Sequence, residues 1–185
     1  MKFRNNKQSF SWSKRFRKAT PPRAWSGVRD ATFWPPLCMQ NKLEQYEYLT
    51  SSLNSSLSEH CLYLNIWSPH RDLFRHANRA NQIQSADSLL PVILFIPGGG
   101  FNYMGSSYKA FYGGVVAALG KVVIVTISYR LGVFGFLRQP SSSFHHSNIG
   151  LLDQIAAIEY VNTHIHSFGG KGVLCSIIVA AISVL

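Results

Sequence analysis

LPVILFIPGGGF, residues 90–101, is the stretch that decides the fold. An apolar run, Val92 to Ile96, ends in three consecutive glycines at positions 98–100. A second apolar run, Val122 to Ile127, follows in KVVIVTISYRLGVFGFL (residues 121–137). Short runs that are rich in β-branched residues, with little polar interruption, are typical of strands buried on both faces. The pair of runs therefore predicts a parallel sheet.

The glycines suit a backbone that turns tightly at the end of a strand and presents bare N–H groups. Such N–H groups bind either a phosphate or the oxyanion of an acyl-transfer reaction. The loop lacks the G-x-G-x-x-G spacing and the G-K-[ST] ending of nucleotide-binding loops, so a phosphate site is not favoured. An oxyanion site needs a nucleophile in the form G-x-S-x-G, and no such pentapeptide occurs in the 185 residues.

Other side chains offer weaker candidates for chemistry. Ser128 and Ser176 lie at or near apolar runs, but neither is flanked by glycine, so a structural role is more typical of them. His145–His146 and the pair His164 and His166 could hold a metal, yet no acid or cysteine stands beside them at ligand spacing. The sequence therefore predicts neither a metal nor a cofactor.

Composition indicates a folded core, because 46% of the residues are apolar and 13% are aromatic. The net charge is +10, and nine basic residues precede the first acid, Asp30. That run suggests nucleic-acid binding as an alternative, but no helical pattern or aromatic platform accompanies it, so a solvated leader is favoured. Residues 1–18 have no apolar segment of the signal-peptide kind. Asn54 begins the tripeptide of an N-glycosylation site, which matters only in a secreted chain.

Three further elements are expected along the chain. Residues 62–67 (LYLNIW) alternate like a strand, and residues 108–119 carry a weak helical pattern. Residues 150–168 predict an amphipathic helix whose apolar face includes Ile155, closed by Gly169 and Gly170. The last 13 residues are mostly apolar; a membrane span needs about 20 residues, so they are expected to be a core strand. The alternation of strands and helices is typical of the α/β class.

Six blocks in register resemble the type-B carboxylesterase/cholinesterase family of the α/β-hydrolases. The resemblance runs from about Arg15 to Gly170 and corresponds to the N-terminal third or so of a full member. Besides the glycine loop, the blocks are AWSGVRDAT (24–32), SEHCLYLNIW (58–67), SYRLGVFGFL (128–137), NIGLLDQ (148–154) and FGG (168–170). The resemblance implies an incomplete α/β-hydrolase fold. We expect three parts: a basic leader without fixed structure (1–14), the family domain (15–170) and an apolar tail whose sequence departs from the family (171–185).

The resemblance also gives particular residues a role. It implies that Gly99 and Gly100 donate backbone hydrogen bonds to the oxyanion. It implies a disulfide between Cys38 and Cys61, which would contribute about 3 kcal/mol in the loop-entropy model. Two buried ion pairs are expected as scaffold, and they join Arg15 to Glu59 and Arg130 to Asp153.

The function that the resemblance implies is hydrolysis of small-molecule carboxylic esters by a Ser–His–Glu/Asp triad, in a secreted or cell-surface protein. The chain departs from the family at Pro97, where His or Tyr is usual, and at Lys171–Gly172, where Asp-Pro is usual. Because the nucleophile, acid and histidine are missing, we expect the chain to be inactive by itself. The alternative is a non-catalytic adhesion protein of the neuroligin type, which has the same scaffold and binds a protein partner.

Overall fold

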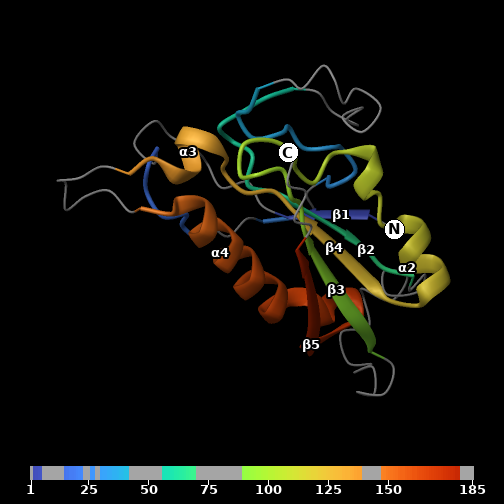
Figure 1. Ribbon diagram of the computed structural model, residues 1–185. Helices are drawn as coiled ribbons and strands as arrows, with labels where there is room; N and C mark the ends of the chain where they lie inside the picture. Colours follow the sequence, from blue (N-terminus) through green and yellow to red (C-terminus); the bar gives the residue numbers. More distant parts are fainter. Residues whose placement is uncertain are drawn as a thin grey trace.

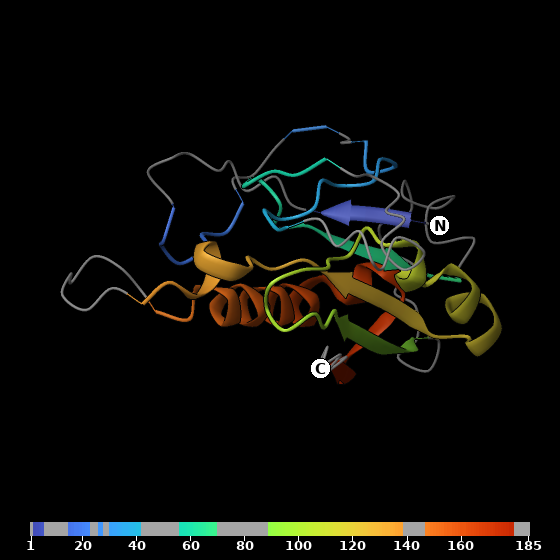
Figure 2. The same ribbon diagram turned by 45° about the horizontal axis from the view of Figure 1, so that its top comes forward.

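The computed structural model describes residues 2–5, 15–22, 26–27, 30–41, 56–69, 89–138 and 147–179. Within these ranges five strands form one sheet in the order β1-β2-β4-β3-β5. Figure 2 shows the succession from β1 at the top, through β2 and β4, to β3 near the bottom. The strands are β1 (Lys2–Asn5), β2 (Leu64–Trp67), β3 (Leu90–Ile96), β4 (Val123–Ile127) and β5 (Gly170–Val179).

The centre of the sheet is parallel, as the two apolar runs predict. β3 pairs in parallel with β4 on one side and with β5 on the other. Val92 and Leu94 of β3 and Val123 and Val125 of β4 are fully buried, which explains the uninterrupted apolar pattern. β2 and β1 extend the sheet in antiparallel pairing. The apolar tail contributes β5 up to Val179, so the expectation of a strand there is confirmed for these residues.

The helices of the described ranges lie at the sides of this sheet. Figure 1 shows α2 (Gly114–Gly120) and α4 (Ile149–His164) on opposite sides of the view, with α3 (Gly132–Phe136) beside α4. Two short 3-10 helices, η4 (Lys109–Phe111) and η5 (Ile165–Phe168), complete the set. The helix predicted over 150–168 is therefore α4 followed by η5. The one predicted over 108–119 is broken between η4 and α2.

The break before α2 lies at Tyr112, whose backbone is extended with φ −69° and ψ 103°, and the next residue, Gly113, lies close against the sheet. A Cβ atom there would lie 2.6 Å from Cγ2 of Ile124 and 2.8 Å from Cε3 of Trp67. The backbone thus passes directly against β4 and β2, and only glycine fits at that point.

One expectation about α4 is wrong, because Ile155 was expected on its buried face and is 45% exposed. The buried positions of the helix are Ile149, Gly150, Asp153 and Val161. Asp153 turns inward because it pairs with a buried arginine, described below. That pair sets the rotation of the helix, and an apolar pattern alone does not reveal it.

The basic leader also differs from expectation. No element was expected before residue 15, whereas Lys2–Asn5 forms β1, paired with Leu64–Trp67. Residues 2–5 carry no apolar alternation, so the sequence has no strand signal there. The other residues of the leader, the glycosylation candidate Asn54 and the pair His145–His146 lie outside the described residues.

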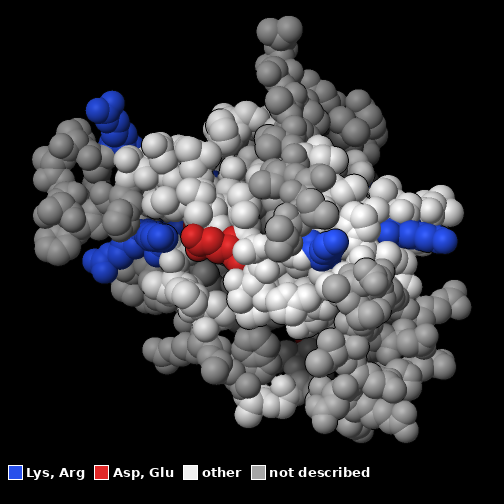
Figure 3. All heavy atoms as spheres, turned by 90° about the horizontal axis from the view of Figure 1, so that it is seen from below, with Lys and Arg blue, Asp and Glu red and all other residues white. Residues whose placement is uncertain are grey.

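Charge is not gathered on the face shown in Figure 3. The described Lys and Arg side chains lie at separate places on that face, and acidic side chains lie among them. No helix within the described ranges is long and apolar enough to cross a membrane.

Candidate functional site

The glycine loop begins where β3 ends. Pro97 follows the strand directly, and its carbonyl oxygen accepts a hydrogen bond of 2.9 Å from the hydroxyl of Tyr129. Tyr129 stands just after β4 and is only 5% exposed. Burial raises the pKa of its hydroxyl to about 12, so it stays protonated and donates at neutral pH. The ends of two neighbouring parallel strands are thereby joined at the base of the loop.

The loop backbone adopts conformations that require glycine. Gly99 has φ +108° and Gly100 has φ +56°. The carbonyl oxygen of Gly99 accepts hydrogen bonds from the N–H of Asn102 (3.0 Å) and of Tyr103 (3.3 Å). A Cβ atom on Gly99 would collide with the carbonyl oxygen of Tyr103, whereas one on Gly100 would meet nothing within 4 Å. Space excludes a side chain at position 99, and φ alone disfavours one at position 100.

This turn leaves two adjacent N–H groups available. Among the described residues, no hydrogen bond has the N–H of Gly99 or of Gly100 as its donor. Gly99 is buried, and Gly100 is exposed. A buried backbone N–H without an acceptor is unusual in a folded protein. Two adjacent backbone N–H groups without acceptors can bind a negatively charged oxygen.

A buried ion pair stands behind the loop, where β4 leads into α3. The side chain of Arg130 donates to both carboxylate oxygens of Asp153, at 2.7 and 2.6 Å, and its backbone N–H donates at 3.2 Å. The two side chains are 3% and 1% exposed. Burial raises the pKa of the Asp153 carboxyl, while the bonds from Arg130 act in the opposite direction. The pair fixes α4 against the end of β4.

The second expected pair is formed but is not buried. Arg15 donates from Nε to Oε2 of Glu59 at 2.8 Å and makes a second contact through Nη2. The side chains are 26% and 24% exposed, so the expectation of burial is wrong for this pair. The hydrogen bond to Glu59 raises the pKa of the Arg15 guanidinium. The same guanidinium lies 5.5 Å from the ring centroid of Phe134.

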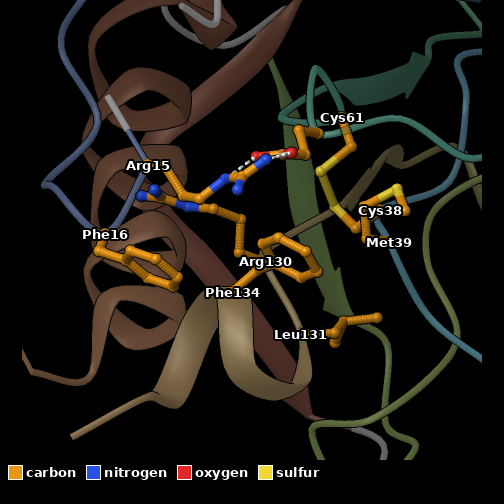
Figure 4. Close-up of a pocket in the computed structure, with 9 residues that line it drawn as sticks. Arg15, Phe16, Cys38, Met39, Cys61, Arg130, Leu131 and Phe134 are labelled. Atoms are coloured by element: carbon orange, nitrogen blue, oxygen red, sulfur yellow. Dashed lines mark hydrogen bonds and ion pairs between the residues drawn. A yellow bond between two sulfur atoms is a disulfide. The ribbon is translucent and has the colours of Figure 1, made fainter. Parts of the chain in front are cut away.

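Figure 4 shows Arg15 and Arg130 on the same side of a disulfide between Cys38 and Cys61. Arg15 pairs with Glu59. Both cysteines are 1% exposed. The cavity between these groups has a volume of about 10 Å³, roughly the space of one water molecule. This cluster is therefore a packed support and holds no substrate.

A much larger cavity of about 550 Å³ lies between residues 18–22, β2 and α4. Ser128, Tyr160 and His164 line it, but no residue of the glycine loop does. The ring of His164 packs on Tyr160, with 4.4 Å between the centroids. No group of three His, Cys, Asp or Glu side chains suited to a metal occurs in the described part of the chain.

Ser128 has a structural environment. It is 4% exposed, its Oγ accepts from the N–H of Ser106 at 3.1 Å, and its hydroxyl bonds that of Ser106 at 2.8 Å. The amide of Asn65 donates to the carbonyl oxygen of Ser106 nearby. Neither this network nor the hydroxyl of Tyr129 was anticipated, because both join residues far apart in sequence.

The centre of the sheet is parallel, a glycine loop follows β3, and Arg130 after β4 anchors α4. This arrangement defines part of an α/β-hydrolase fold. Solved structures agree. The chain superposes on a thermophilic PNB esterase with a TM-score of 0.75 and 34% identity, covering 90% of this chain and 32% of that one. A second PNB esterase gives 0.74 and 34%, covering 91% and 31%.

The chain belongs to the carboxylesterase family, whose model matches residues 12–178. Similar proteins include the pyrethroid hydrolase Ces2e of Rattus norvegicus, 42% identical over 85% of this chain and 26% of that protein. The fumonisin B1 esterase of Sphingopyxis macrogoltabida is 38% identical over 84% of this chain and 26% of that protein. An acetylcholinesterase of Leptinotarsa decemlineata is 36% identical, with coverages of 84% and 26%. The chain thus spans about a quarter of the length of these relatives.

Proposed function

We propose that Gly99 and Gly100 form the oxyanion-binding part of a carboxylesterase active site. The observation that carries this is the pair of adjacent N–H groups, without acceptors among the described residues, at the end of a buried parallel strand. The names of the relatives, which are esterases and hydrolases, favour carboxylic esters as the substrate class. The substrates would be small molecules.

The chemistry follows from where charge develops. When a serine oxygen attacks the carbonyl carbon of an ester, the carbonyl oxygen becomes negative. Donors held about 2.7–3.1 Å from that oxygen stabilise the transition state, and removing one costs about 10²–10³ in kcat. A further donor in this fold is the N–H of the residue that follows the nucleophile.

The nucleophile is not supplied by these 185 residues. They contain no G-x-S-x-G sequence, and Ser128 is buried in a structural hydrogen-bond network. We therefore propose that the chain does not hydrolyse esters by itself. Residues 12–178, which match the family, would supply one part of the active site of a complete enzyme.

The role of the loop can be tested by grafting it into a complete enzyme. PNB esterase would receive Pro97–Met104 of this chain in place of its own loop. We expect the graft to hydrolyse p-nitrophenyl butyrate within about tenfold of its parent, because the same two N–H groups are presented. A folded graft that has lost more than about 100-fold of kcat/KM, the loss typical of a missing donor, would contradict the proposal.

The disulfide between two buried cysteines favours an oxidising compartment, and with it a secreted or cell-surface protein. A non-catalytic adhesion protein would have the same scaffold. The residue that the longest transcript encodes at the nucleophile position distinguishes an esterase from an adhesion protein. Serine there supports the esterase, and glycine or another residue supports adhesion.

A further inference from the structure

The glycine loop contains a strained residue that is not glycine. Between Gly99 and Met104, four of six residues have positive φ, and two of these, Phe101 (+61°) and Met104 (+81°), carry side chains. Left-handed backbone is unfavourable for such residues and persists only where the surroundings impose it. Met104 is 6% exposed and packs with Leu37 and Tyr108. Something must hold it in this conformation.

The side-chain amide of Gln40 binds both backbone groups of Met104. Its Oε1 accepts from the N–H of Met104 at 2.7 Å, and its Nε2 donates to the carbonyl oxygen of Met104 at 3.1 Å. The same amide donates to the carbonyl oxygen of Cys38 (3.0 Å) and accepts from the hydroxyl of Tyr108 (3.1 Å). The amide thus makes four hydrogen bonds. Two of them hold the backbone of Met104, and the other two go to Cys38 and Tyr108.

Gln40 stands on a segment that is itself anchored. Cys38, two residues earlier, is bonded to Cys61, and Leu37 donates through its N–H to the carbonyl oxygen of Ser56 at 2.9 Å. On the other side of Met104, the N–H of Tyr103 reaches back to the carbonyl oxygen of Gly99. The conformation of Met104 is therefore connected both to a rigid platform and to the two glycines.

We propose that Gln40 is a positioning residue, which holds Met104 in its left-handed conformation and so sets the direction of the Gly99 and Gly100 N–H groups. The inference rests on the proposed oxyanion role for its functional meaning. Gln40 touches neither substrate nor reacting atoms. Its effect passes through the backbone of the loop.

Nuclear magnetic resonance of the 185-residue chain, labelled with ¹⁵N-glycine, tests this directly. We expect Gln40→Ala to shift the amide cross-peaks of Gly99 and Gly100 by more than their linewidth. Gln40→Glu keeps the acceptor but loses both donors, and we expect it to shift the same peaks. Adding Met104→Gly to Gln40→Ala should return the peaks toward their original positions, because glycine adopts the conformation without help.

The matched control is Val161→Ala, a truncation in the core of α4 that lowers stability without contacting the loop. A residue with a merely structural role would behave like this control and leave the loop glycines in place. Unshifted Gly99 and Gly100 peaks in Gln40→Ala would overturn the proposal. If Gln40→Ala does not fold, unshifted peaks in Gln40→Glu would overturn it. Failure of the oxyanion role is seen separately, in the ester turnover of the loop graft.

Discussion

Adjacent glycines in the loop differ in what surrounds them, and this difference can be measured. Gly99 has no room for a methyl group because the carbonyl oxygen of Tyr103 occupies that position. Gly100 has open space and needs only a left-handed backbone. The two positions therefore separate steric exclusion from conformational preference at neighbouring residues.

We expect Gly100→Ala to lower the free energy of unfolding by about 1–2 kcal/mol, the cost of placing a Cβ in left-handed backbone. Gly99→Ala adds a collision with backbone to a positive φ, so its loss should be larger. Urea unfolding followed by circular dichroism measures both. Equal losses for the two variants would show that the space around Gly99 is not restricted in solution.

Tyr129 gives the loop a dependence on alkaline pH. Its pKa is raised to about 12 in the folded protein, against 10.0 ordinarily. Between these values the unfolded chain has lost the proton and the folded chain has kept it, so stability falls as the pH rises through this window. Burial also raises the pKa of Tyr108, which adds in the same direction.

Tyr129→Phe should therefore show a shallower loss of stability between pH 10 and 12 than the parent chain, and Tyr108 should contribute to the loss that is left. At pH 7 it should be less stable by about 1–3 kcal/mol, since the carbonyl oxygen of Pro97 loses its donor. Unfolding curves of the parent chain and of Tyr129→Phe, recorded at pH 7 and across the alkaline window, measure both effects. If stability fell equally steeply with pH in Tyr129→Phe and in the parent chain, Tyr129 would not be the source of the alkaline pH dependence.

At the scale of elements, α4 is fixed by Arg130 and Asp153. Removing the carboxylate leaves a buried arginine unpaired, so Asp153→Ala should cost about 3–5 kcal/mol. Glu59→Ala, at the pair whose side chains are 26% and 24% exposed, should cost much less because solvent screens that pair. Thermal and urea unfolding measure the contrast. A small loss for Asp153→Ala would mean that the pair does not anchor the helix.

The elements also show what a sequence can and cannot predict. β3, β4 and α4 carry strong local patterns, and their positions follow from apolar runs and a closing glycine. The rotation of α4 does not, because it depends on an ion pair between residues 23 positions apart. β1 has no local signal, since its residues show no apolar alternation.

The same division applies to the site. The turn at Gly99 and Gly100 is predictable, because consecutive glycines directly after a buried strand indicate a tight turn, whereas their oxyanion role comes from the family resemblance and stays a proposal. The supports of the loop are not. Gln40 lies 64 residues from Met104, and Tyr129 lies 32 residues from Pro97. Only the folded chain brings these groups together.

For the molecule as a whole, a disulfide, a buried ion pair and a parallel sheet support the glycine loop, which we propose to be one part of an esterase site. The relatives are about four times the length that it matches. We propose that the oxyanion loop is preformed, while the 185 residues contain no G-x-S-x-G sequence to supply a nucleophile.

The most direct test is the hydrolysis of p-nitrophenyl butyrate by the purified 185-residue chain, with a fluorophosphonate that modifies active serines as a second readout. The account predicts no turnover above the rate in buffer and no labelled serine. Saturable turnover that is abolished by the fluorophosphonate would contradict it, because the chain would then contain an active serine outside any G-x-S-x-G sequence.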